Sequence, residues 1–144
     1  MRSEQWCWTF YGFQTQVGNK PVRDWINGLP HDAIDGSGLF CKTAHYPIDE
    51  LLDVLAYMQV RPNVEWHSPQ NFKPLEAGLS EIRFSTEDHW YRIYGIFWPI
   101  GRAKYTFLHG TDKKVKNDKD GKKLANDRRD QLRRRQASIH EFSF

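Results

Sequence analysis

Alternating apolar and polar residues mark the strands expected in this chain. Alternation with a period of two buries one face of a strand, and aromatic and β-branched residues favour extended backbone. The pattern predicts an opening strand at residues 5–13 and three further strands at 79–84, 90–98 and 105–109. Short turns separate the last three strands, so we expect them to pair antiparallel.

Apolar residues spaced three or four apart predict the helices. Val22, Trp25 and Ile26 share one helix face, Pro21 suits the first turn, and Gly28 ends the helix. A thinner stripe predicts a basic helix over about residues 118–135, formed by Leu124, Ala125, Arg128, Leu132 and Arg135.

A further helical pattern is interrupted. Residues 31–35 and 50–60 have helical character, but residues 36–49 do not. When 36–49 are removed, one continuous apolar stripe results, made of Ile34, Leu51, Leu52, Leu55 and Met58. The pattern therefore predicts either one helix with an inserted segment at about 36–49 or two helical pieces.

Together these elements predict an α+β fold. We expect a small antiparallel sheet with two N-terminal helices on one face and a basic C-terminal helix. A chain of 144 residues suits a single domain, 1–144.

Charge is distributed unevenly along the chain. Residues 113–135 hold 11 Lys or Arg and 4 Asp, a net +7, while the whole chain is only +3. Such a segment suits a polyanionic or acidic protein partner, although a solvated helix face is the commoner explanation.

Disulfide-bonded, membrane-spanning and metal-binding proteins are classes that we do not expect here. Cys7 and Cys41 have no metal-binding or redox spacing, which favours free thiols in a reducing cytoplasm. No apolar stretch approaches the ~18 residues of a membrane span. The six histidines lack paired ligand spacing, so we expect no metal and no cofactor.

Strand alternation also brings candidate functional residues together. His109 alternates with Tyr105 and Phe107, and we expect it on the face away from the helices with Arg83 and Arg92. Tyr94 alternates with Arg92, and Lys113 and Lys114 follow His109 closely. Ion pairs, a structural histidine and core aromatic residues are the plainer interpretations.

This set of side chains suits RNA. Guanidinium groups bind phosphate, imidazole transfers protons near neutral pH, and aromatic rings stack on unpaired bases. Cleavage by attack of the ribose 2′-OH on its own phosphodiester needs a proton acceptor, a proton donor and positive charge, but no metal.

Three segments resemble the RelE/ParE toxin superfamily, and more closely its phage-derived, HigB-like branch. They are PLEAGLSEIRF at 74–84, YRIYGIF at 91–97 and FLHGTDKKVKND at 107–118. The resemblance implies a type II toxin that cuts messenger RNA on the ribosome in the cytoplasm and is neutralised by a cognate antitoxin, often encoded on mobile DNA. The branch usually has an aromatic residue before the two lysines, where this chain has Thr111 and Asp112.

The resemblance also implies roles for particular residues. Arg83 and Arg92 would bind phosphate, and His109, Lys113 and Lys114 would transfer protons and stabilise charge. Beside Tyr94, the residues expected to contact RNA lie on the basic helix: Lys122, Lys123, Arg133, Arg134 and Arg135. A ParE-like gyrase inhibitor and a non-catalytic module that binds nucleic acid or a phage component are the alternatives.

Overall fold

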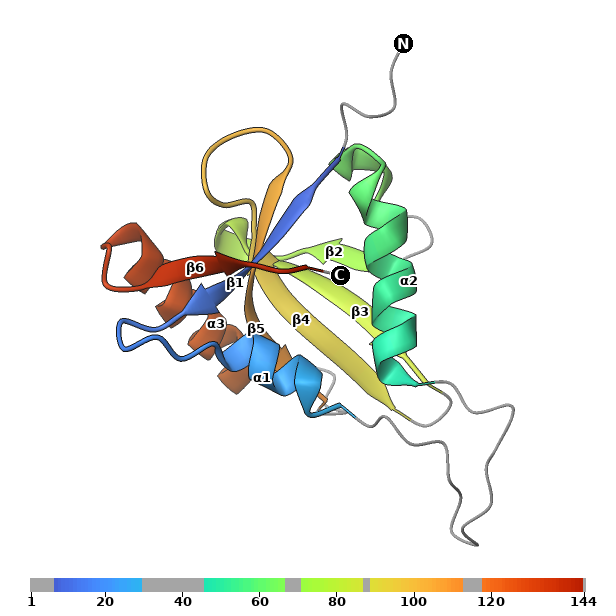
Figure 1. Ribbon diagram of the computed structural model, residues 1–144, viewed down its shortest axis with the longest axis horizontal. Helices are drawn as coiled ribbons and strands as arrows, with labels where there is room; N and C mark the ends of the chain where they lie inside the picture. Colours follow the sequence, from blue (N-terminus) through green and yellow to red (C-terminus); the bar gives the residue numbers. More distant parts are fainter. Residues whose placement is uncertain (1–6, 30–45, 67–70, 87–88, 113–117, 144) are drawn as a thin grey trace, which may run out of the picture.

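A mixed sheet of six strands forms the centre of the computed structural model (Figure 1), which describes residues 7–29, 46–66, 71–86, 89–112 and 118–143. The strands are β1 (Thr9–Gln14), β2 (Phe72–Pro74), β3 (Ser80–Ser85), β4 (Trp90–Ile96), β5 (Lys104–Thr111) and β6 (Ser138–Glu141). Their order in the sheet is β2-β3-β4-β5-β1-β6. The α+β class is therefore confirmed.

The prediction of an antiparallel sheet is wrong for one pair of strands. Strands β2 to β5 pair antiparallel in sequence, as short turns dictate, but β1 lies parallel to β5. Strand β6 then pairs antiparallel with the other edge of β1. Alternation along a strand defines its two faces but carries no information about the direction of its neighbour, so the parallel pair was not predictable from this pattern.

In the described part of the chain, three α-helices cover the two faces of the sheet: α1 (Pro21–Asn27), α2 (Pro47–Gln59) and α3 (Lys119–Arg133). Figure 1 shows α1 and α2 in front of the sheet and α3 behind it. Apolar residues of α1 and α2 share one core cluster with Ile82, Phe84 and Ile93 of the sheet. Ala125 and Leu132 of α3 share a second cluster with Tyr94 and Leu108.

Two boundaries differ from the predicted ones. Residues Pro47 to Asp49 form the first turn of α2, where proline is well tolerated, so the proposed insertion does not extend to residue 49. Residues 36–45 lie outside the described residues, and an insertion there stays a prediction. On α3, Leu124 is exposed, and Gly121 and Arg129 occupy buried positions.

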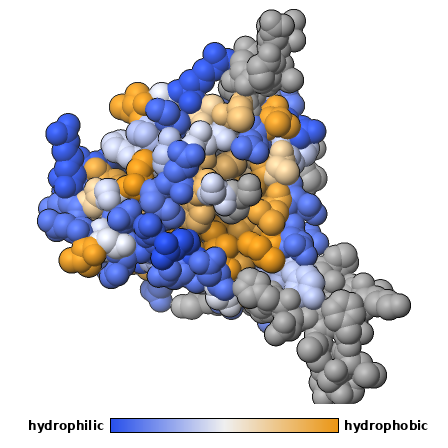
Figure 2. All heavy atoms as spheres, viewed as in Figure 1, coloured by the Kyte–Doolittle hydropathy of each residue, from blue (hydrophilic) through white to orange (hydrophobic). Residues whose placement is uncertain are grey.

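Strand β5 is buried on both faces. Tyr105 and Phe107 belong to the cluster under α1 and α2, and Leu108 belongs to the cluster under α3. Figure 2 shows the face of α1 and α2, with apolar side chains gathered between the two helices.

No helix in the described part of the chain is long and apolar enough to cross a membrane.

A β-bulge interrupts the pairing of β4 with β5. Tyr94 lies opposite His109, but the next residue, Gly95, lies opposite Phe107. Leu108 is therefore an extra residue on β5, and strand alternation restarts after it.

Gly95, beside the bulge, lies where β4 and β5 approach each other closely. A Cβ atom at this position would lie 2.6 Å from the backbone oxygen of Thr106. We expect Gly95→Ala to lower the free energy of unfolding by about 1–3 kcal/mol, because the strands must move apart. Gly28→Ala is the control, since its Cβ atom would meet only ordinary contacts. Equal urea midpoints for the two variants would contradict this tight approach.

Candidate functional site

Polar side chains gather on the α3 face of the sheet, across β3, β4 and β5. Arg83 pairs with Arg92 in the strand register, and Glu81 pairs with Tyr94, which in turn pairs with His109. Glu81, Arg83, Arg92 and His109 are called the polar cluster below. Three adjacent strands thus supply it, at the end of β3 and the beginning of β4.

The bulge places His109 in the polar cluster. Its ring stacks on that of Tyr94, with centroids 6.3 Å apart and planes only 10° from parallel. Regular alternation would have put His109 beside Phe107, on the face of α1 and α2. Because Leu108 is the extra residue, both Leu108 and His109 lie on the α3 face, so the expected grouping with Arg92 is observed for a different reason.

Glu81 holds the two arginines of the cluster together. Its buried carboxylate lies 2.5 Å from Nε of Arg83 and 3.8 Å from Nε of Arg92. The side chain of Glu81 is only 4% exposed, compared with 37% for Arg83 and 15% for Arg92. A desolvated carboxylate is stable only with such partners, so Glu81 fixes both guanidinium groups while leaving them partly accessible.

Tyr94 has a structural position. Its hydroxyl donates a hydrogen bond to Oδ2 of Asp118 at 3.0 Å, and Oδ1 of Asp118 accepts one from the backbone N–H of Gly121 at 3.0 Å. Burial, followed by the contact with Asp118, raises the pKa of Tyr94 far above its ordinary value, so the phenol stays neutral. The ring is fully buried, and the predicted stacking of Tyr94 on RNA does not fit this geometry.

An exposed aromatic ring lies beside the arginines instead. Trp90 is 56% exposed and lines an open cavity of about 470 Å³ with Lys73, Arg83 and Arg92. Sequence reasoning missed Trp90 as a functional residue, although its alternation with Arg92 was a usable signal. A ring, two guanidinium groups and an ammonium group around one cavity are the components of a site for a nucleotide.

The basic residues of α3 have different structural roles. Nη1 of Arg128 donates to the backbone oxygen of Leu108 at 2.8 Å, and burial lowers the pKa of Arg128. Nη1 of Arg129 donates to the backbone oxygen of Ala77 at 2.7 Å. Arg128 therefore fastens α3 to β5, and Arg129 fastens it to the turn between β2 and β3.

The remaining basic residues lie along α3. Lys122 and Lys123 belong to its N-terminal half, close in sequence to Asp118. Arg133, Arg134 and Arg135 are exposed at the other end of this 15-residue helix, about 20 Å away, so they are not part of the cluster. Lys113 and Lys114 lie outside the described residues, and their roles stay predictions.

Another cavity, which is lined in part by His140, lies on the opposite face of the sheet. It has a volume of about 490 Å³ and lies between α1, α2 and the segment after β6. Nε2 of His140 is buried there without a hydrogen-bond partner, and burial, together with nearby Lys20 and Arg23, lowers the pKa of His140. The sheet separates this cavity from the polar cluster.

Within the described residues, no three His, Cys, Asp or Glu side chains are placed to bind a metal ion together. No protein-family model, curated protein or solved structure matches this chain. The geometry of the polar cluster is therefore the basis for any assignment of function.

The contact between Tyr94 and Asp118 predicts a measurable loss of stability. In Tyr94→Phe the buried carboxylate of Asp118 loses a hydrogen-bond donor, and we expect the free energy of unfolding to fall by about 1–3 kcal/mol. Tyr11→Phe, on β1 and partly exposed, should change it by less than about 0.5 kcal/mol. Urea denaturation of both variants measures the difference, and a Tyr94→Phe protein as stable as wild type would refute the anchoring role.

Proposed function

We propose that this protein is a toxin of the RelE/ParE superfamily, in its HigB-like branch, and that it cuts messenger RNA on the ribosome. The observation that carries the proposal is the convergence of Arg83, Arg92 and His109 on one partly exposed sheet face. The small α+β fold with α1 and α2 on one face supports it further. A cognate antitoxin in the cytoplasm follows as part of the proposal.

The proposed reaction is transesterification within the RNA. The 2′-oxygen of the ribose bonds to the adjacent phosphorus while the bond from phosphorus to the 5′-oxygen breaks. A base accepts the 2′-OH proton, an acid gives a proton to the leaving 5′-oxygen, and cations stabilise the phosphate. His109 is the candidate for proton transfer, Arg83 and Arg92 are the candidates for phosphate binding, and Lys113 and Lys114 supply further charge.

One observation favours a second candidate, a nucleic-acid-binding module without catalysis. Glu81 contacts both arginines, and this contact neutralises part of the charge offered to a phosphate. Yet such a module predicts dispersed or buried residues, and here the polar cluster is assembled with Arg83 and His109 partly exposed. Catalysis is therefore the better-supported proposal.

Induced expression in a bacterial host distinguishes these functions. We expect wild type to arrest growth and to generate new 5′ ends within reading frames. His109→Ala should slow cleavage by about 10²–10⁴-fold because proton transfer is lost, and Arg92→Ala should weaken phosphate stabilisation. Growth arrest without new 5′ ends would point to gyrase or another target. Folded protein with neither effect would favour the binding module.

Trp90 supplies the ring that stacks on a base in this proposal. We expect Trp90→Ala to weaken binding of single-stranded RNA by about 1–3 kcal/mol, and Trp90→Phe to retain most of the affinity. Ile100→Ala removes another exposed apolar side chain, in the loop after β4, and should leave binding unchanged. Fluorescence anisotropy with a labelled oligonucleotide measures all three, and equal affinities for the alanine and phenylalanine variants would count against stacking.

A further inference from the structure

Tyr94 lies between members of the polar cluster, although its side chain is fully buried. In the strand register it pairs with Glu81 of β3 on one side and with His109 of β5 on the other. Arg92 is two residues away on the same face of β4, because side chains alternate along a strand. Tyr94 therefore adjoins two side chains that are proposed to act on RNA, Arg92 and His109.

Glu81 holds Arg92 less firmly than it holds Arg83. Its carboxylate accepts a hydrogen bond from Nε of Arg83 at 2.5 Å, but Nε of Arg92 lies 3.8 Å away, beyond hydrogen-bond distance. The guanidinium group of Arg92 forms a second contact, a side-chain hydrogen bond with the hydroxyl of Tyr94. Since the side chain of Arg92 is only 15% exposed, these buried partners define where its guanidinium group lies.

The ring of Tyr94 lies beside the imidazole of His109. The two rings are cross-strand partners whose planes are only 10° from parallel, with centroids 6.3 Å apart. The bulge at Leu108 brings His109 to this face, and the ring of Tyr94 then limits how the imidazole can turn. The hydroxyl and the ring of one buried side chain thus adjoin two different functional groups.

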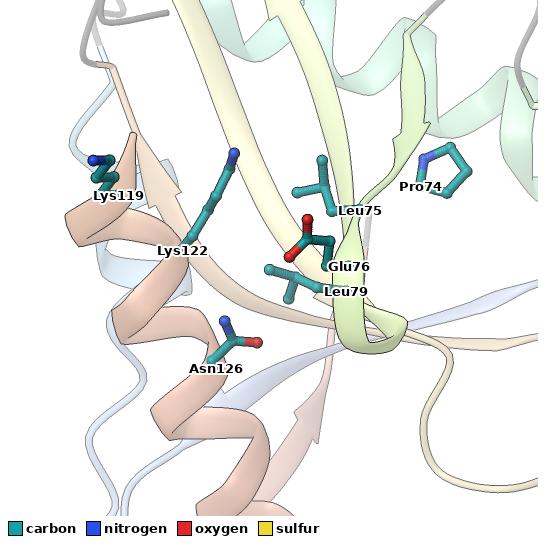
Figure 3. A pocket seen from close by; sticks show the side chains of 7 residues that line it. All are labelled: Pro74, Leu75, Glu76, Leu79, Lys119, Lys122 and Asn126. Carbon is teal, nitrogen blue, oxygen red and sulfur yellow. The ribbon is translucent and has the colours of Figure 1, made fainter. Parts of the chain in front are cut away.

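Asp118 fixes the hydroxyl of Tyr94 from the side of α3. Its Oδ2 accepts the hydrogen bond from Tyr94, and its Oδ1 accepts one from the backbone of Gly121 in the first turn of the helix. A cavity of about 520 Å³ lies between α3 and the turn that joins β2 to β3, and Lys119 and Lys122 line it from the helix (Figure 3). Asp118 therefore holds the beginning of α3 to β4 across a face that is only partly packed.

We propose that Tyr94 is a positioning residue of the proposed site: its hydroxyl orients the guanidinium group of Arg92, and its ring orients the imidazole of His109. The inference rests on the proposed function, because the residues that Tyr94 positions are those proposed to bind phosphate and to transfer protons. Tyr94 itself touches no RNA, since its side chain is fully buried. A small displacement of a positioned group is enough to slow a reaction strongly.

A double-mutant cycle tests the role of the hydroxyl. The probe is a labelled oligouridylate with 2′-O-methyl groups, which cannot be cleaved through the 2′-oxygen, and fluorescence anisotropy measures its affinity. We expect Tyr94→Phe to weaken binding about 3–10-fold, because Arg92 loses a hydrogen-bond partner. In the Arg92→Ala background the same change should have no effect, since no guanidinium group remains to be oriented.

Asp118→Ala is the matched control for a purely structural role of Tyr94. It removes the other partner of the Tyr94 hydroxyl and the cap of α3, so it should lower the urea midpoint at least as much as Tyr94→Phe does. Because Tyr94 and Arg92 are both intact in this variant, its affinity for the probe should not fall. If Asp118→Ala and Tyr94→Phe weakened binding equally, Tyr94 would act through α3 and not through Arg92.

Cleavage tests the role of the ring, which Tyr94→Phe keeps and Tyr94→Leu removes. The measurement is single-turnover cleavage of a short messenger RNA on bacterial ribosomes at saturating protein, so that the rate does not depend on affinity. We expect Tyr94→Leu to be about tenfold slower than Tyr94→Phe, and to have no further effect in the His109→Ala background. Equal rates for the two folded variants would overturn the role of the ring. If Tyr94→Leu does not fold, the binding cycle with Arg92 still decides whether Tyr94 is a positioning residue.

The outcomes also separate this inference from the proposed function. If wild type cleaves the messenger RNA but the effects of Tyr94→Phe and Arg92→Ala on binding are additive, the proposed function stands and the positioning of Arg92 is wrong. If wild type binds the probe but cuts no messenger RNA, cleavage is wrong, and only a non-additive cycle would keep the role of Tyr94 toward Arg92. A wild-type protein that neither binds nor cleaves overturns both.

Discussion

Burial of β5 on both of its faces is the constraint on which the rest of the structure depends. Tyr105, Phe107 and Leu108 are each fully buried, so both faces of the sheet need a covering layer. Helices α1 and α2 cover one face, and α3 must cover the other even though its sequence is strongly basic. The described part of the basic sequence, residues 118–135, is therefore not a loose tail, since Arg128 and Arg129 donate hydrogen bonds to the backbone of Leu108 and Ala77.

Two buried carboxylates organise the charged face. Glu81 contacts arginines from two adjacent strands, and Asp118 connects Tyr94 to the first turn of α3. Each carboxylate is desolvated, so each needs its partners, and those partners are in turn held in place. The positive groups that face solvent are thus positioned before any ligand arrives, which lowers the entropy lost on binding.

Part of this arrangement could be read from the sequence. Clear alternation predicted β3 and β4, and apolar spacing together with Pro21 and Gly28 predicted α1. The largest error in the predicted fold concerned the direction of a strand pair and not the existence of a strand. The parallel pairing of β1 with β5 depends on contacts between residues far apart in the chain. Strand β6 (Ser138–Glu141) has little apolar alternation and owes its conformation to backbone pairing with β1.

The candidate site was predictable to a similar degree. Arg83, Arg92 and His109 were expected on one face, but the bulge that places His109 there depends on the register with β4. Alternation places Tyr94 and Trp90 on the same face of β4. Only packing under α3 distinguishes the buried phenol of Tyr94 from the exposed indole of Trp90.

The place of β1 in the sheet has a consequence for how the chain folds during synthesis. Both neighbours of β1, the strands β5 and β6, leave the ribosome long after β1 itself. The hairpin of β3 and β4 can form early, but His109, Asp118 and the covering helix α3 are added only near the end of the described chain. Non-local pairing of this kind slows folding. A nascent chain therefore carries Arg83 and Arg92 before His109 has been added beside them. The complete α3 face of the sheet exists only once translation has passed α3.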